Sequence, residues 1–446
     1  MCARLTFFLF VVCCLPNSGA EPLPGTQPLT EEGDLAAKMV QGIHRFLERE
    51  TGEVTKARES LWKLDATSPE AWEKSIEQKR IRLRQLLGIV DTRSKPEMLL
   101  QTPGLSVKDL FADGGSREIA ARMETGTVIS RVEWAVFRAL KAEGLLTDGS
   151  SEKTAFIVIP DCGFTAEQSF GMEKGIPPET QWANRLGGIG HPVIAMTLPS
   201  RRPGPLMPGG RQPMYSQREV LWRAGFEMGR TLVGYEVQKV LAAVDWLCAE
   251  DPKRKVGIIG TGDGGLIALL AAALDPRIES TGLEGSFGPM EEQWREPIDL
   301  TVFGLLKEFG AAELLAMISP RAVVIRNAGR HIVNYTGEGG GAPGGIREFT
   351  KEEIDREAAK GIAMRLRGGQ TIREERPEQF LLYTLAPFVW YETNIPWAVP
   401  QPMTGIRPQD ENSRQARLFN AILEDTQTLM RQAQQKRGEY WKDANF

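Results

Sequence analysis

Histidine and cysteine, which often supply bases, nucleophiles and metal ligands, are scarce in this chain. Its 446 residues include three histidines and five cysteines. They do not recur at the Cys/His spacings typical of zinc sites, and no glycine-rich turn carries the Lys-Ser/Thr of a phosphate-binding P-loop. The sequence therefore predicts no metal and no cofactor. The net charge of −4, with basic residues spread along the chain, argues against nucleic acid as a partner.

Long hydrophobic runs are also missing, apart from a short one at the N-terminus. Residues 5–15 are almost entirely apolar, follow Arg4 and precede small residues that end at Ala20. The run of about 11 residues is shorter than the roughly 20 that a membrane-spanning helix needs. We predict a signal peptide over residues 1–20, cleaved near Ala20, and no membrane span. The protein is then secreted, either periplasmic or extracellular.

The five cysteines divide between this leader and the rest of the chain. Acylation of Cys13 or Cys14 would make the protein a lipoprotein, which we keep as an alternative. After cleavage only Cys162 and Cys248 remain, and one disulfide or two free thiols both fit. The sequence is not that of a disulfide scaffold.

Short apolar runs alternate with amphipathic helical patterns through the middle of the chain. Four runs, over residues 155–159, 192–196, 256–259 and 322–325, are too short for helices. The longest helical pattern between them spans about residues 218–248. This alternation predicts an α/β fold whose doubly wound, mostly parallel sheet is covered on both faces. In such folds the sites lie at the carboxyl ends of the strands.

The flanking segments have other patterns. Residues 21–105 form a predicted N-terminal helical region, in which Ser68-Pro69-Glu70 signals a helix start and Gly88 a stop. The α/β part is expected over residues 106–400, and residues 401–446 read as a linker and a C-terminal helix. Residues 437–442 repeat the R-x-x-x-W-K pattern of residues 58–63. The repeat suggests a following domain or protein that carries a second unit.

A glycine-rich turn follows the third apolar run. Residues 255–259 read as a buried strand, and Gly260-Thr261-Gly262-Asp263-Gly264-Gly265 leads into an apolar helix from Leu266. A strand, a tight turn with small flanking residues and a helix form the nucleophile elbow, whose pattern is G-x-S-x-G. Both flanking glycines are present here. The nucleophile position is Gly262, which has no side chain.

The turn and its surroundings resemble the α/β-hydrolase superfamily. The resemblance is closest to the acetyl xylan esterase and dienelactone hydrolase-like secreted proteins of planctomycete-type bacteria. It covers about residues 125–400 and is carried by Ala243-Val244-Asp245-Trp246-Leu247, Asp275-Pro276-Arg277-Ile278 and Ile318-Ser319-Pro320-Arg321, besides the turn itself. It implies an α/β-hydrolase fold with Ser on the elbow, an acid after a later strand and His after the last strand.

The chain departs from that catalytic pattern at each position. The run over residues 322–325 ends in Arg326-Asn327-Ala328, without an acid. No histidine follows residues 380–391, the last candidate strand. The segment that usually reads His-Gly and supplies the oxyanion hole is Pro160-Asp161-Cys162-Gly163. We therefore expect no hydrolysis by a Ser triad.

Two other sources of catalysis stay open. Asp263 is a nucleophile in one interpretation, as in superfamily members with an elbow aspartate, and an acid at the helix N-terminus in the other. His331 follows a strand end and would activate water as a general base, with Glu284 orienting it. The alternative for His331 and Glu284 is an ordinary place in surface loops.

Binding residues are predicted around the same strand ends. Asp161 and Cys162 stand at the oxyanion segment, where Cys162 also fits a buried small residue. Arg201 and Arg202, with Arg211 farther along a proline-rich loop, would hold a carboxylate or a sulfated sugar by bidentate contacts, or would be solvated. We expect either a binding or supporting module, with a carbohydrate or carbohydrate ester as its ligand, or a hydrolase that uses Asp263 or a His331-activated water.

Overall fold

The structure, a computed structural model, describes residues 23–27, 29–101, 119–149, 153–203, 215–337, 340–366, 368–388 and 399–442. The predicted signal peptide lies outside these ranges. The chain forms two compact units, Met1–Thr51 and Gly52–Phe446. In the first unit the only described helix is the N-terminal part of α1 (Leu35–Leu61). Within the described ranges, every helix is too short or too polar to cross a membrane.

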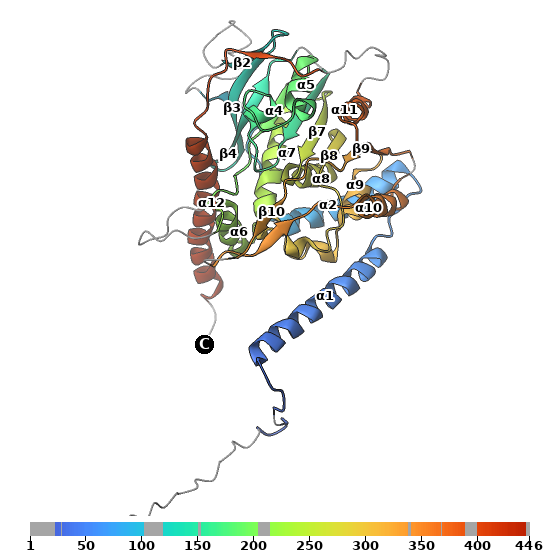
Figure 1. Ribbon diagram of the computed structural model, residues 1–446, viewed down its shortest axis with the longest axis vertical. Coiled ribbons are helices and arrows are strands. Elements are labelled where there is room, and N and C mark those ends of the chain that lie inside the picture. The colour runs from blue at the N-terminus through green and yellow to red at the C-terminus, as the bar shows by residue number, and fades with distance from the viewer. Residues whose placement is uncertain are drawn as a thin grey trace, which may run out of the picture. The chain divides into compact units, whose positions relative to one another are not determined.

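The second unit is built on one large sheet (Figure 1). Its order is β12-β9-β8-β7-β5-β6-β4-β3-β2-β13, and β1 pairs with β3. The strands from β12 to β6 run parallel, whereas those from β4 onward are antiparallel. The strands are β1 (Met98–Leu100), β2 (Ile119–Met123), β3 (Val128–Phe137), β4 (Leu140–Thr147), β5 (Thr154–Ile159), β6 (Val193–Met196), β7 (Lys255–Thr261), β8 (Ile278–Glu284), β9 (Ala322–Arg326), β12 (Thr371–Arg373) and β13 (Met403–Thr404), and β10 (Val333–Tyr335) pairs separately with β11 (Gly344–Ile346). The predicted α/β-hydrolase fold, doubly wound and mostly parallel, is confirmed.

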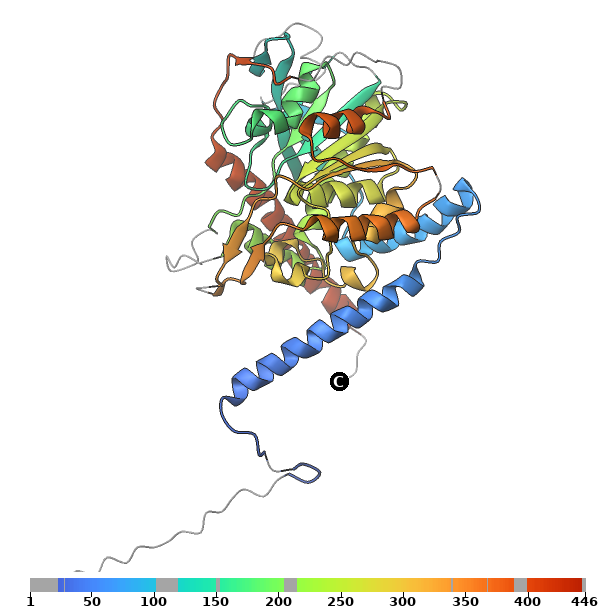
Figure 2. The same cartoon turned by 45° about the vertical axis from the view of Figure 1, so that its right-hand side comes forward.

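Helices cover both faces of this sheet (Figure 2). They are α2 (Pro69–Leu87), α4 (Ala166–Ser169), α5 (Trp182–Gly188), α6 (Gln217–Glu227), α7 (Leu232–Glu250), α8 (Asp263–Leu274), α9 (Ala311–Ile318), α10 (Lys351–Ala363), α11 (Pro377–Leu385) and α12 (Glu411–Tyr440), with short 3-10 turns at Pro178–Thr180, Gln293–Arg295, Ile298–Leu300 and Leu305–Lys307. Alternate residues of β5 face opposite ways. Ile157 belongs to the core under α2, α7, α8 and α9, and Phe156 to the core under α5 and α11.

Two helices differ from the sequence-based expectation. The long pattern over residues 218–248 is two helices, α6 and α7, because the chain turns between them at Gly229, whose φ is 66°. The expected last strand over residues 380–391 is wrong in its described part, which is helical in α11. Pro377 at the first turn starts that helix. The last parallel strand is instead β12, a short edge strand with little hydrophobic signal.

The start of α2 confirms the capping pattern read from the sequence. The hydroxyl of Ser68 accepts a hydrogen bond from the backbone N–H of Ala71, and Gly88 ends the helix with a φ of 72°. The apolar side of α2 is buried in the core of the second unit. Its side chains Trp72, Ile76 and Leu83 are each at most 2% exposed.

The C-terminal helix α12 packs along α6 and β4 (Figure 1). Leu418, Phe419 and Ile422 are buried there. Arg414, also buried, forms an ion pair of 2.7 Å with Glu167. This part of the predicted tail therefore belongs to the same hydrophobic core as the sheet.

Candidate functional site

The turn after β7 has the backbone of a nucleophile elbow. Gly262 adopts φ 55° and ψ −121°, a region that side-chain-bearing residues rarely occupy. A Cβ atom on Gly264 would overlap the carbonyl oxygen of Ile159, and one on Gly260 would overlap that of Gly264. The flanking glycines are therefore required by the close approach of three backbone segments. The predicted strand, turn and helix are confirmed.

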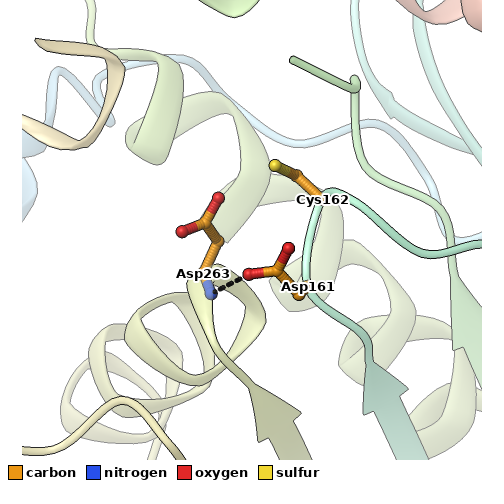
Figure 3. A group of neighbouring side chains, drawn as sticks. All are labelled: Asp161, Cys162 and Asp263. Carbon is orange, nitrogen blue, oxygen red and sulfur yellow. Dashed lines mark hydrogen bonds between the residues drawn. The ribbon is translucent and has the colours of Figure 1, made fainter. Parts of the chain in front are cut away.

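The space where an elbow nucleophile would stand contains the carboxylate of Asp161. A Cβ atom on Gly262 would overlap Oδ2 of Asp161. That oxygen accepts a hydrogen bond of 3.0 Å from the backbone N–H of Asp263, as Figure 3 shows. Oδ1 accepts a second one, 2.9 Å long, from the N–H of Gly163. Asp161 is 1% exposed, so both bonds lie in a site shielded from water.

These two amides come from the segments that form an oxyanion hole in this motif. One belongs to the residue after the nucleophile position, and the other to the neighbouring strand-end loop. In catalysis such amides stabilise a negatively charged oxygen that develops on the substrate. Here the carboxylate of Asp161 already satisfies both. The protein thus supplies its own anion to this place.

His331 is the titratable partner of Asp161. Its Nδ1 lies 3.7 Å from Oδ1 of Asp161, too far for a hydrogen bond, and its side chain is 48% exposed. The interaction with Asp161 raises the pKa of His331 above its usual value. Burial opposes ionisation of Asp161, but His331 and the amides of Gly163 and Asp263 together lower its pKa.

Asp263 faces a buried arginine. Nη1 of Arg201 lies 2.7 Å from Oδ2 of Asp263, and both side chains are at most 7% exposed. Burial raises the pKa of Asp263, and Arg201 opposes the rise. The sequence placed Arg201 in a ligand-binding or solvated loop. The solvated alternative is wrong, because the guanidinium is enclosed and paired.

A chain of buried charges continues from Arg201. Arg201 also forms an ion pair of 3.0 Å with Asp299, and Asp299 in turn accepts a hydrogen bond of 2.6 Å from Arg218. Arg218 then pairs with Glu236 of α7 at 2.5 Å. These pairs connect the loop after β6 to α6 and α7 and fix the Arg201 side chain.

Asp161, Cys162 and Asp263 lie close enough together to share one cation (Figure 3). Arg201 already supplies positive charge to this group, with Nη1 also 3.2 Å from Sγ of Cys162. Burial raises the pKa of the Cys162 thiol well above its usual value. A protonated thiol is a poor metal ligand and a poor nucleophile. The described side chains therefore favour a guanidinium over a metal ion here.

Glu284 does not orient His331, contrary to the expectation. Its carboxylate accepts hydrogen bonds from Nε1 of Trp182 at 2.8 Å and from Oγ1 of Thr261 at 3.0 Å, and it pairs with Arg326. Glu284 is at the end of β8, as predicted, but these three contacts fix the strand ends. The acid that His331 meets is Asp161, from the other side of the elbow.

The remaining predicted basic residues lie apart from the elbow. Nη1 of Arg202 donates a hydrogen bond of 2.7 Å to the side-chain oxygen of Asn412, in α12. Arg211 lies outside the described residues. Cys248 is on α7 and Cys162 on the loop after β5, and both are free thiols, which settles the disulfide question.

Three residues near the elbow were missed by the sequence analysis. Asp299, Ser286 and Arg330 stand in loops, and no local pattern distinguishes them from ordinary loop residues. Glu236 offered a signal, because an acid beside Val237 interrupts the apolar stripe of α7 and therefore needs a buried partner.

A cavity of about 240 Å³ opens beside Asp161 at the strand ends. Phe164, Ile176 and Trp182 supply its apolar walls, and Asp161 and Glu284 supply acids. Cavities with mostly apolar walls and a few fixed polar groups are typical ligand sites.

No family model matches the chain, and no curated protein matches it either. Among solved structures it is similar to a protein assigned as an acetyl xylan esterase from Bacteroides fragilis, with 16% identity over 70% of this chain and 78% of that chain and a TM-score of 0.48. It is also similar to glucuronoyl esterase from Solibacter usitatus, with 13% identity over 72% of this chain and 94% of that chain and a TM-score of 0.42. Acetyl xylan esterase 1 from Thermoanaerobacterium sp. is 13% identical over 78% of this chain and 93% of that chain, with a TM-score of 0.38.

Proposed function

We propose that this protein is a binding module with an α/β-hydrolase fold and does not hydrolyse esters through an acyl-enzyme. The observation that carries the proposal is the carboxylate of Asp161. It fills the volume next to Gly262 where the nucleophile side chain would stand, and it accepts the hydrogen bond of the Asp263 amide at 3.0 Å. The protein thus has the hydrolase fold, but its own Asp161 carboxylate occupies the position of the nucleophile.

Electrostatics supports this proposal. An ester carbonyl that entered the oxyanion hole would need the amides of Gly163 and Asp263, which are already bonded to Asp161. The negative charge of a tetrahedral intermediate would also develop beside an ionised carboxylate in a site with little water. Like charges at such a distance repel strongly in a low dielectric.

The ligand that we propose is a carbohydrate or carbohydrate ester, bound in the cavity of about 240 Å³. The support is the combination of ring and polar groups around it. Phe164 and Trp182 offer aromatic walls, and the carboxylates of Asp161 and Glu284, each already bonded to protein donors, give the lining its negative charge. Few fixed polar groups on apolar walls orient a polar ligand by its hydroxyls.

Hydrolysis by a His331-activated water is the second candidate. It is favoured by one observation, the pairing of a half-exposed His331 with the buried carboxylate of Asp161 at 3.7 Å. A histidine with an acid partner is a possible general base. Asp263 is a weaker candidate, because its carboxylate faces Arg201 and its amide is bonded to Asp161.

Turnover of an aryl ester separates these two candidates, and activity-based labelling tests for an acyl-enzyme. We expect the purified wild type to show neither labelling by a fluorophosphonate probe nor turnover of p-nitrophenyl acetate above buffer. The Gly262→Ser variant should also stay unlabelled, because its side chain would overlap Asp161.

Turnover by the wild type that His331→Gln abolishes would establish the second candidate instead. Stoichiometric labelling that peptide mapping places on Ser286 or in the elbow would refute the binding-module proposal. Cys248→Ser serves as the matched control, since it changes a free thiol on α7.

A further inference from the structure

A second, smaller cavity lies under the elbow. Its volume is about 40 Å³, and its lining includes Asp263, Ser286, Glu296 and Arg330 together with the apolar side chain of Leu266. Ser286 packs directly against the turn, because a Cβ atom on Gly265 would overlap its hydroxyl. The cavity is therefore part of the elbow environment but is not used in the proposed pairing of Asp161 and His331.

Three buried polar atoms that border this cavity have no hydrogen-bond partner among the described residues. They are Oδ2 of Asp263, Oγ of Ser286 and Nη1 of Arg330. The contact of Asp263 with Arg201 is an ion pair by distance only and lacks hydrogen-bond geometry. An unsatisfied buried polar atom costs about 1–3 kcal/mol. Oδ2 of Asp263 still has the charge of Arg201 at 2.7 Å, so Oγ of Ser286 and Nη1 of Arg330 are the two atoms that indicate a missing partner.

The three atoms together fit a hydroxyl group. Asp263 offers an acceptor, Arg330 offers a donor, and Ser286 can serve as either. A hydroxyl both donates and accepts, so a single group can meet all three requirements. The volume also fits, because a water-sized group needs about 10–15 Å³ of cavity space.

The charges around the cavity disfavour an anion. Asp161, Asp263 and Glu296 border it, and Arg330 is the one cation among its lining residues, already paired with Glu296. A carboxylate that entered would face more negative than positive charge. A neutral polar group has no such penalty.

We propose that this cavity is a subsite for the primary hydroxyl of a neutral hexose, bound by Asp263, Ser286 and Arg330. The inference rests on the proposed function as a carbohydrate-binding module. It deepens that function by naming the group that is recognised and by excluding uronic acids from this subsite.

Two sugars that differ at one carbon test the subsite. Methyl β-D-glucopyranoside carries a hydroxymethyl group where methyl β-D-glucuronide carries a carboxylate. By isothermal titration calorimetry, we expect the wild type to bind the glucoside at least tenfold more tightly than the glucuronide. Ser286→Ala should weaken glucoside binding about tenfold, the effect of losing one hydrogen bond of about 1.4 kcal/mol.

Ser130→Ala is the matched control. Ser130 also has a buried hydroxyl without a partner among the described residues, but it lies on β3 and does not line the cavity. Its variant should bind the glucoside as the wild type does. Circular dichroism and thermal unfolding check that both variants are folded.

The outcomes separate the subsite from the function. Equal binding of the two sugars, or glucoside binding that Ser286→Ala leaves unchanged, would overturn the subsite and leave carbohydrate binding intact. If the wild type binds neither sugar, the carbohydrate ligand and the subsite both fall. The absence of labelling would then still stand as a separate result on hydrolysis.

Discussion

The elbow turn and the strand-end loops around it match the pattern of a nucleophile-elbow enzyme to very different degrees. The turn keeps the backbone of a nucleophile elbow in full, with φ 55° and ψ −121° at Gly262. The loops do not keep the side chains of a triad. Asn327 follows β9 where an acid is expected, and His331 follows the same strand and meets Asp161 instead of an acid of its own loop.

The difference has a packing origin. Backbone at the turn is held by neighbours that leave no room for a Cβ atom, such as the carbonyl oxygen of Ile159 next to Gly264. Such a position is under constraint whether or not the protein catalyses anything. The side chain of a triad residue is not fixed by such packing, and only its catalytic role restricts which residue stands there. In this protein the pair of Asp161 and His331 lies beside Gly262.

Filling the turn should break this constraint and give the largest effect. In Gly264→Val the new side chain would overlap the backbone at Ile159 and Pro160, which cannot move without displacing β5. We expect a loss of about 3 kcal/mol or more in the free energy of unfolding, measured with urea. Gly438→Ala in α12 is the control, because nothing lies within 4 Å of its Cβ position. Equal stability of the two variants would contradict the packing explanation.

Removing the charge of Asp263 should have the next largest effect. In Asp263→Asn the guanidinium of Arg201 keeps Asp299 but loses one of its two buried carboxylates. Breaking a buried pair is costly, and we expect a loss of about 2 kcal/mol in unfolding free energy. Asp355→Asn is the matched control, since its pair with Arg373 is 48% exposed on the carboxylate side. A loss below about 0.5 kcal/mol, typical of surface changes, would favour the simple helix-terminus interpretation of Asp263.

Two histidines in loops next to the sheet strands, His191 and His331, sharpen the comparison by opposite pH dependences. Burial lowers the pKa of His191 to about 4, below the 6.5 of an unfolded chain. As the pH falls, the unfolded state binds the proton before the folded state does. The contribution of neutral, buried His191 to the free energy of unfolding is therefore present above pH 6.5 and is lost as the pH falls towards 4. Between pH 6.5 and 5 we expect a loss of about 2 kcal/mol that His191→Gln lacks, measured by urea unfolding at each pH.

His331→Gln provides the contrast to His191→Gln. The pKa of His331 is raised in the folded protein, so its stabilising pair with Asp161 is complete below pH 6.5 and is lost as the pH rises through the folded pKa. Because His331 is half exposed, this contribution should stay below about 1 kcal/mol. If the wild type and His191→Gln lose the same unfolding free energy between pH 6.5 and 5, the titrating group is not His191.

The amino-acid sequence by itself determined the fold class and the elbow. Short apolar runs separated by amphipathic helices admit few arrangements, and the glycines at positions 260 and 264 mark a turn of known geometry. It failed where periodicity is ambiguous, as in the apolar run that became α11. It also identified the candidate residues near the strand ends, because every parallel strand delivers its following loop to the same edge.

Only the tertiary structure decided which of those residues meet. Asp161 and Asp263 are 102 positions apart, yet the amide of one bonds the carboxylate of the other. Which residues form such a contact depends on the direction of each side chain and on distances of a few tenths of an ångström, which separate contact from overlap. Sequence patterns carry no such information: they marked Arg201 and Asp263 as separate candidates, and only the fold shows that the two form a buried pair.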